Sequence, residues 1–300
     1  MESSNQIISS HSPEITLAIK REDLIHPFVS GNKYRKLKYN LLEAQTQNKP
    51  QILTFGGAFS NHIAAVAAAG KEAGMQTIGI IRGEELAAKT NENPTLRFAQ
   101  ECGMQLEFVS RETYRLKNDS GFVEKLRENF GDFYLLPEGG TNNLAVKGCE
   151  EILTDADAEF DYICCAAGTG GTISGLVNSA KPHQQVLGFP ALKGDFLKAE
   201  IRKFARQGNW DLVSDYHFGG YAKVNADLID FMNGFYKENA IPTDPIYTGK
   251  MVFGVMDLIQ KGYFPKASKI LMIHTGGIQG ISGMNLHLKN IKSPLIDYHD

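Results

Sequence analysis

The feature that most constrains the fold of this chain is a regular alternation of short apolar runs with segments of helix length. Runs of strand length occur at residues 51–55, 77–81, 161–167 and 269–274, and helix-length segments separate them. Parallel strands need long crossover connections, which are usually helices. The alternation therefore predicts an α/β protein with parallel sheets.

The remaining elements follow the same rule. Further strands are expected at residues 15–23, 106–109, 133–136 and 186–189. Helices are expected at 60–73, 91–102, 121–129, 144–153, from 172, and at 196–206, 225–238, 250–260 and 280–288.

Lys33 stands at an expected strand-to-helix junction, in the stretch Gly31-Asn-Lys-Tyr-Arg-Lys36. A cation at a helix start is disfavoured by the helix dipole, which lowers its pKa, and the neighbouring Arg35 and Lys36 would lower it further. A lysine must be neutral to attack a carbonyl carbon or to remove a proton. Lys33 is therefore a candidate catalytic residue, although on this stretch alone a solvated basic helix face is the simpler explanation.

A glycine-rich loop, Gly168-Thr-Gly-Gly-Thr172, lies between an expected strand and an expected helix. The amides of such a loop can surround an anion, aided by hydroxyls and the helix dipole. It is neither a Walker P-loop nor a complete dinucleotide fingerprint. The loop predicts a phosphate site, with an ordinary tight turn as the alternative.

A second glycine turn, Gly56-Gly-Ala-Phe-Ser-Asn-His62, also leads from a strand into a helix. Ser60 can cap that helix, and the helix start offers donors to a carboxylate. A capped strand–turn–helix without a ligand would look the same.

Composition excludes several classes of function. The net charge is −3, and the 31 lysines and arginines are scattered rather than clustered, so a nucleic-acid partner is not expected. No apolar run reaches the roughly 20 residues that a membrane span needs. The first residues have no signal-peptide pattern, and the four cysteines have no metal-ligand spacing, so we expect a reduced, cytoplasmic protein without a metal site.

Five stretches, taken in order, resemble the motifs of the fold-type II pyridoxal 5'-phosphate (PLP) enzymes. They are 31–36, 56–62, 168–172, Tyr247-Thr-Gly-Lys250 and His274-Thr-Gly-Gly277. The pattern is most similar to the branch containing D-cysteine desulfhydrase and 1-aminocyclopropane-1-carboxylate (ACC) deaminase. The resemblance extends from about Lys20 to about Gly283.

The resemblance implies a two-domain, parallel-sheet fold of the tryptophan synthase beta-like type. The larger PLP-binding domain would comprise residues 1–35 and 144–300, and the smaller inserted domain residues 36–143. A homodimer is also implied, as is a small amino-acid substrate bound between the domains.

The same resemblance assigns roles to individual residues. Lys33 would bind PLP covalently and then act as the base at the substrate Cα. Ser60, Asn61 and His62 would hold the substrate, with Ser60 also serving proton transfer and Asn61 contacting the cofactor. The expected phosphate ligands are Gly168, Thr169, Gly170, Gly171 and Thr172, and the expected active-site tyrosines are Tyr221 and Tyr247.

Two threonines bear on the reaction. ACC deaminases typically have Glu at the Thr248 position, facing the pyridine nitrogen, and Leu at the Thr275 position. A hydroxyl gives a weaker electron sink than a carboxylate, which suffices when a good leaving group is on Cβ. Thr248 and Thr275 therefore favour β-elimination from D-cysteine, giving pyruvate, ammonia and hydrogen sulfide.

Three alternatives remain open at this point. The first is ACC deaminase, and the second is elimination or replacement on L-amino acids such as serine or O-acetylserine. The third is a non-catalytic phosphate- or nucleotide-binding α/β protein. Because elimination is followed by hydrolysis of its product, both lyase and hydrolase are expected as class names.

Overall fold

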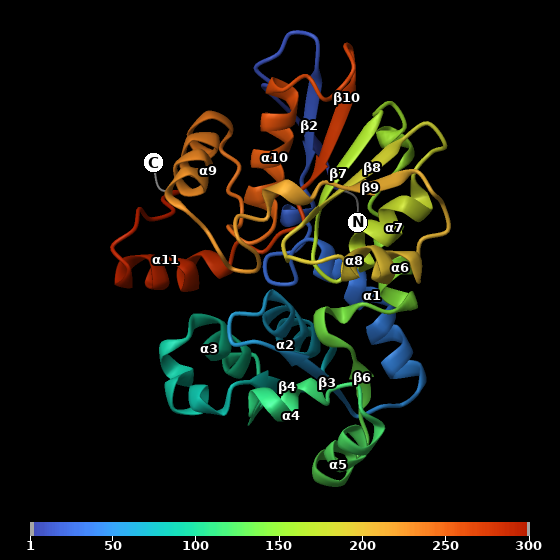
Figure 1. Ribbon diagram of the computed structural model, residues 1–300. Coiled ribbons are helices and arrows are strands. Elements are labelled where there is room, and N and C mark those ends of the chain that lie inside the picture. The colour runs from blue at the N-terminus through green and yellow to red at the C-terminus, as the bar shows by residue number, and fades with distance from the viewer. Residues whose placement is uncertain (1–2, 299–300) are drawn as a thin grey trace.

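The computed structural model describes residues 3–298 of the 300-residue chain. Two sheets lie one above the other in Figure 1, each with helices packed around it. We call the part containing the six-stranded sheet the large unit and the part containing the four-stranded sheet the small unit.

The sheet of the large unit has the strand order β1-β2-β10-β7-β8-β9. All neighbouring pairs are parallel except β1 with β2, which is antiparallel. Its strands are β1 (Asn5–Ile8), β2 (Thr16–Lys20), β10 (Lys269–Ile273), β7 (Tyr162–Ala167), β8 (Gln185–Pro190) and β9 (Trp210–Leu212). The edge strands β1 and β9 were not predicted, because each has only three or four residues and too little pattern to recognise.

The sheet of the small unit has the order β5-β4-β3-β6 and is parallel throughout. Its strands are β3 (Gln51–Gly56), β4 (Gln76–Arg82), β5 (Gln105–Val109) and β6 (Tyr134–Leu136). The expected α/β fold with parallel sheets is therefore confirmed.

The helices agree with the expected segments, with shorter ends at three of them, but the short helix at Arg111–Arg115 was not predicted. The segment predicted at 91–102 becomes α3 only from Pro94, because Asn93 caps it by accepting from the amides of Thr95 and Leu96. The segments predicted at 144–153 and 196–206 end earlier, as α6 and α8. The helices are α1 (Asn32–Thr46), α2 (Asn61–Ala73), α3 (Pro94–Glu101), α4 (Arg111–Arg115), α5 (Ser120–Phe130), α6 (Asn143–Cys149), α7 (Gly171–Ser179), α8 (Phe196–Arg202), α9 (Ala226–Asn239), α10 (Thr248–Gln260) and α11 (Gly280–Asn290). Short 3₁₀ helices are η1 (Glu22–Leu24), η2 (Glu84–Glu92), η3 (Glu138–Gly140), η4 (Asp155–Asp157) and η5 (Ser214–Tyr216).

The central strand β7 shows why the large sheet reads as continuously apolar. Cys164 packs with Met251 and Val255 of α10, whereas the adjacent Cys165 packs with Leu176 of α7. Successive strand residues face opposite sides, so both faces of this sheet are buried under helices. The described cysteines carry free thiols.

Helix α1 joins the two units and runs unbroken through residue 36. It packs closely on α6, where a Cβ at Gly148 would lie 1.9 Å from the Arg35 carbonyl oxygen. The division at residues 36 and 143 stays a prediction. Among the described residues, no helix has both the length and the apolar character needed to cross a bilayer.

Candidate active site

Lys33 lies in the first turn of α1, and a tight backbone contact fixes that turn. Gly31 caps the helix with φ = 62°, and a Cβ there would lie 2.1 Å from the Thr275 carbonyl oxygen. The same carbonyl accepts the Asn32 amide at 3.3 Å. The turn after β10 therefore positions the start of α1, and only glycine fits at the contact.

The amine of Lys33 is chemically prepared for the predicted role. Its burial, together with the nearby charge of Lys36, lowers the pKa of Lys33 from 10.5 to about 7. The expected effect of Lys36 is thus confirmed. Arg35 does not add to it, because its guanidinium is paired with the buried Glu22 carboxylate at 2.8 and 2.9 Å.

The loop before α7 has the form of an anion site. Gly170 has φ = 85°, and the first helical bond of α7 runs from the Ser174 amide to the Gly170 carbonyl. The preceding amides point away from the helix and have no intrahelical acceptor. Thr172 accepts from the Asn32 side chain at 2.8 Å, which places this loop beside Lys33.

Lys36 faces the same loop, which sequence reasoning missed. Its Nζ donates to the Gly139 carbonyl and the Thr141 hydroxyl, both at 3.0 Å, and to the Thr169 hydroxyl at 3.4 Å. The side chain is buried and reaches the cavity from one helical turn beyond Lys33. The spacing of three residues, which puts both lysines on one helix face, was the available signal.

The second glycine turn places three predicted residues at the start of α2. The Ser60 hydroxyl caps the helix by accepting from the amides of His62 and Ile63. Asn61 lies against the turn after β10, where a Cβ at Gly277 would come 2.8 Å from its Nδ2. Ser60, Asn61 and His62 all line the cavity described below.

His62 is more deeply enclosed than its predicted substrate role requires. The Thr54 hydroxyl donates to the Leu136 carbonyl at 2.9 Å, so it accepts from His62 Nε2–H at 2.8 Å. Burial, with the charges of Lys33 and Lys36, lowers the pKa of His62 well below 6.5. The ring is a neutral wall of the cavity, and its contact with substrate stays a prediction.

The two predicted tyrosines meet on the opposite wall. Their ring centroids are 6.2 Å apart, with the ring planes at 66° to each other. Burial raises the pKa of Tyr247 well above 10, so this phenol stays protonated. Tyr247 also packs on the phosphate loop, where a Cβ at Gly168 would lie 3.1 Å from its ring.

Thr275 and Thr248 differ in their surroundings. Thr275 lines the cavity, but Thr248 is fully buried behind it. The Thr248 hydroxyl donates to the Asp244 carboxylate and accepts from the Asp244 amide, both at 2.8 Å. The one proton of this hydroxyl is therefore already used in the bond to Asp244. A contact between Thr248 and the cofactor stays a prediction.

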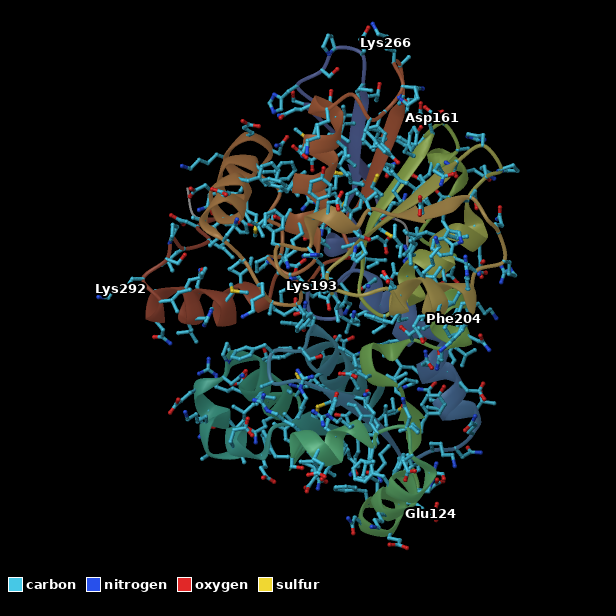
Figure 2. All side chains as sticks on the ribbon, viewed as in Figure 1. Glu124, Asp161, Lys193, Phe204, Lys266 and Lys292 are labelled. Carbon is cyan, nitrogen blue, oxygen red and sulfur yellow. The ribbon has the colours of Figure 1, made fainter. Side chains whose placement is uncertain are left out.

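These groups surround one cavity of about 560 Å³ between the units. It receives most of the predicted site residues, but not Gly171 or Thr248. The predicted residues that line it are Lys33, Ser60, Asn61, His62, Gly168, Thr169, Gly170, Thr172, Tyr221, Tyr247 and Thr275. Figure 2 shows side chains filling the boundary between the units, with Lys193 beside it.

The side chains and amides that line the cavity are suited to bind PLP. A near-neutral lysine amine can bind the aldehyde carbon, and the glycine loop with Lys36 and Thr169 can hold the phosphate. No cluster of three or more metal-ligating side chains occurs within residues 3–298.

Comparison with known proteins agrees with this geometry. A family model described as pyridoxal-phosphate dependent enzyme matches residues 7–276. The bifunctional D-cysteine desulfhydrase/1-aminocyclopropane-1-carboxylate deaminase, mitochondrial, of Arabidopsis thaliana is 30% identical over 88% of this chain and 73% of its own length. The 1-aminocyclopropane-1-carboxylate deaminase of Bradyrhizobium sp. (strain ORS 278) is 25% identical over 93% of this chain and 94% of its own.

A solved structure gives the same result. A protein described as an ACC deaminase homologue superposes with a TM-score of 0.83 and 28% identity, covering 97% of this chain and 93% of that one. The non-catalytic alternative is therefore wrong, and the relatives' names support a lyase rather than the expected hydrolase. The family model covers most of the chain, and the relatives match along most of its length. The chain therefore belongs to the pyridoxal-phosphate-dependent enzyme family, as a lyase that uses PLP.

Proposed function

We propose that this enzyme catalyses β-elimination from a small amino acid with a leaving group on Cβ, with D-cysteine as the preferred substrate. The carrying observation is that Thr275 lines the cavity at the turn after β10, while Thr248 stands at the start of α10, where ACC deaminases typically have Glu. The bound cofactor supplies an electron sink for the pair left at Cα. With Thr248 rather than Glu at the start of α10, the sink is weak and best suits a substrate whose leaving group departs readily.

Asp244 does not replace the missing carboxylate. Both of its oxygens accept hydrogen bonds at the start of α10, from the amides of Ile246, Tyr247 and Thr248 and from the Thr248 hydroxyl. A carboxylate with four donors is fixed as a helix cap, and it is buried.

The chain's own groups account for the remaining tasks. The Lys33 amine, with its pKa of about 7, takes the Cα proton. The start of α2, with Ser60 and Asn61, holds the α-carboxylate. Tyr247 and Tyr221, which line the cavity and whose raised pKa keeps them protonated, can donate a proton to sulfur.

The reaction balances without a further reactant. The Cβ–S bond breaks with its electron pair on sulfur, which takes up a proton and leaves as hydrogen sulfide. One water then converts the three-carbon remainder to pyruvate and ammonia. We further propose that the enzyme is a homodimer and acts in the cytoplasm.

The test measures sulfide and keto acid released from D-cysteine, L-cysteine and ACC by the PLP-loaded protein. We expect sulfide and pyruvate from D-cysteine and little product from the other two. α-Ketobutyrate from ACC without sulfide would favour the named activity of the Bradyrhizobium relative and contradict the proposal.

A variant at Lys33 tests the mechanism. Lys33→Ala is expected to abolish turnover and the visible absorbance of the bound cofactor while the circular dichroism spectrum stays the same. Lys38→Ala is the matched control, because this exposed lysine of the same helix pairs with Glu151 at 2.7 Å. Turnover by Lys33→Ala would rule out the assigned base.

A further inference from the structure

We propose that Arg82 forms a second carboxylate site in the cavity and that the enzyme also accepts amino acids bearing an acidic group on the Cβ substituent. The inference rests on the proposed β-elimination and extends it to a substrate class. Arg82 was not among the residues singled out from the sequence.

Arg82 reaches the cavity from the carboxyl end of β4. Ile81 pairs with Gly56 of β3, which sets Arg82 beside the turn that leads into α2. Its Nη2 lies 3.6 Å from the position that a Cβ on Gly57 would occupy, and both residues line the cavity. Arg82 therefore lies next to the start of α2, where Ser60 is. It belongs to β4, whereas Ser60 follows β3.

The guanidinium is supported but not paired. It lies over the Tyr114 ring at 5.7 Å, a cation–π arrangement that leaves its N–H donors available. Within residues 3–298 the guanidinium makes no hydrogen bond or ion pair beside this contact. An arginine in this state can bind a carboxylate through two parallel hydrogen bonds.

The nearest acid does not neutralise it. Glu138 is the acidic side chain among the described residues that line the cavity. Its carboxylate accepts the Tyr114 hydroxyl at 2.7 Å and lies 3.5 Å from Lys117 Nζ. Glu138 is therefore bound to Tyr114 and Lys117, and within residues 3–298 it forms no ion pair with Arg82.

The charges in the cavity leave Arg82 without an assigned anion. Three cationic side chains line it, namely Lys33, Lys36 and Arg82. Lys33 is close to neutral, and Lys36 faces the phosphate loop. The start of α2 binds the α-carboxylate of the substrate. A second carboxylate of the substrate is therefore the ligand that would neutralise the charge of Arg82.

Tyr221 is compatible with such a ligand. It lines the same cavity as Arg82, burial raises its pKa, and the charge of Arg82 opposes this rise. A phenol that stays protonated can donate to the same carboxylate. Lys193 lies near this part of the cavity, 3.6 Å from the position of a Cβ on Gly220, and adds positive charge at the boundary.

S-Carboxymethylcysteine and S-carbamoylmethylcysteine provide a matched pair, because they have nearly the same shape and differ in charge. Elimination from the first breaks the Cβ–S bond, and the sulfur takes up a proton and leaves as thioglycolate. One water converts the remainder to pyruvate and ammonia. The amide analogue reacts in the same way and releases mercaptoacetamide.

The experiment compares kcat/KM for this pair, using the enantiomer that is active as cysteine, in the PLP-loaded enzyme. We expect the wild type to prefer the acid by about tenfold or more, and Arg82→Gln to remove that preference. Arg82→Lys should retain part of it, because the charge remains without the forked donors. Arg97→Gln, an exposed position on α3, is the matched control and should keep the wild-type ratio.

A binding measurement separates this proposal from the proposed reaction. Calorimetry of Lys33→Ala with added PLP should show the same preference for the acid, and Lys33→Ala/Arg82→Gln should lack it. Failure of the wild type to release keto acid from cysteine would contradict the reaction, while the calorimetric ratio would still test Arg82.

Two results would overturn the second carboxylate site. One is a wild-type acid-to-amide ratio near one. The other is an equal loss with Arg82→Gln for cysteine, the acid and the amide, which would place the α-carboxylate on Arg82 instead.

Discussion

At the scale of single residues, the site depends on a few backbone and charge contacts around Lys33. Gly31 lets the helix start approach the Thr275 carbonyl, and the burial of Lys33 near Lys36 keeps its amine reactive. Both effects are local, so each can be tested by one substitution and one matched control.

Gly31→Ala is expected to destabilise the protein by about 3 kcal/mol or more, because it combines an unfavourable backbone conformation with a collision at Thr275. Gly74→Ala is the control, since Gly74 also has a positive φ, 65°, but open space around it. That change should cost about 1 kcal/mol. Urea unfolding of both variants measures the difference, and equal losses would show that the contact with Thr275 is unimportant.

The lowered pKa of Lys33 predicts a pH-dependent stability of the PLP-free protein. Between pH 7 and 10.5 the unfolded chain holds a proton on Lys33 that the folded chain does not, so the free energy of unfolding rises with pH in this window. Relative to Lys33→Met, the wild type should be less stable below pH 7, and the deficit should shrink toward pH 10.5. A constant difference across this window would mean that Lys33 is not buried as a neutral amine.

At the scale of elements, the phosphate site is shared between two helix starts. The loop before α7 contributes amides and Thr169, while α1 contributes Lys36 through one helical turn. Anion binding here therefore depends on the packing of α1 beside α7 as well as on the glycine loop.

Lys36→Gln should weaken binding of PLP by roughly tenfold, since it removes a charged hydrogen-bond donor at the phosphate. Binding of pyridoxal, which has no phosphate, should change little. Fluorescence titration of the PLP-free protein with both ligands gives the comparison, with Lys38→Gln on the exposed face of α1 as control. Equal weakening for both ligands would contradict a phosphate contact.

At the scale of the whole molecule, the cavity is built from both units. Lys33 and Thr275 come from the large-unit side, whereas Arg82 ends a strand of the small sheet and Ser60 caps α2 of the small unit. A ligand in this cavity contacts both units and therefore links their stabilities.

PLP at about 100 times its dissociation constant should raise the free energy of unfolding by about 2.7 kcal/mol. We expect one cooperative calorimetric transition that moves upward by several degrees. Lys33→Ala should show a smaller shift at the same PLP concentration. Two separate transitions, of which PLP moves only one, would contradict the coupling between the units.

The homodimer is a prediction at the same scale, and sedimentation of the PLP-loaded protein tests it. We expect a particle with twice the mass of one chain. Sedimentation as a single chain at micromolar concentration would contradict it.

The sequence by itself determined the alternation of strands and helices, because strand and helix periods are local and follow from side-chain polarity. It also determined the glycine turns and Lys33, since backbone freedom and amine chemistry belong to residue types. Short edge strands such as β1 could not be predicted from the sequence, because four residues are too few to show an alternation of apolar and polar side chains.

Only the tertiary structure decided which polar groups share the cavity. Lys36 and Thr169 are 133 positions apart in the chain, and their contact depends on how α1 packs beside α7. The sequence likewise could not predict that the Thr248 hydroxyl is bonded to Asp244 or that the Arg82 guanidinium is unpaired. Hydrogen-bond partners and burial arise from long-range packing, which fixes the chemistry of a polar side chain only when the chain has folded.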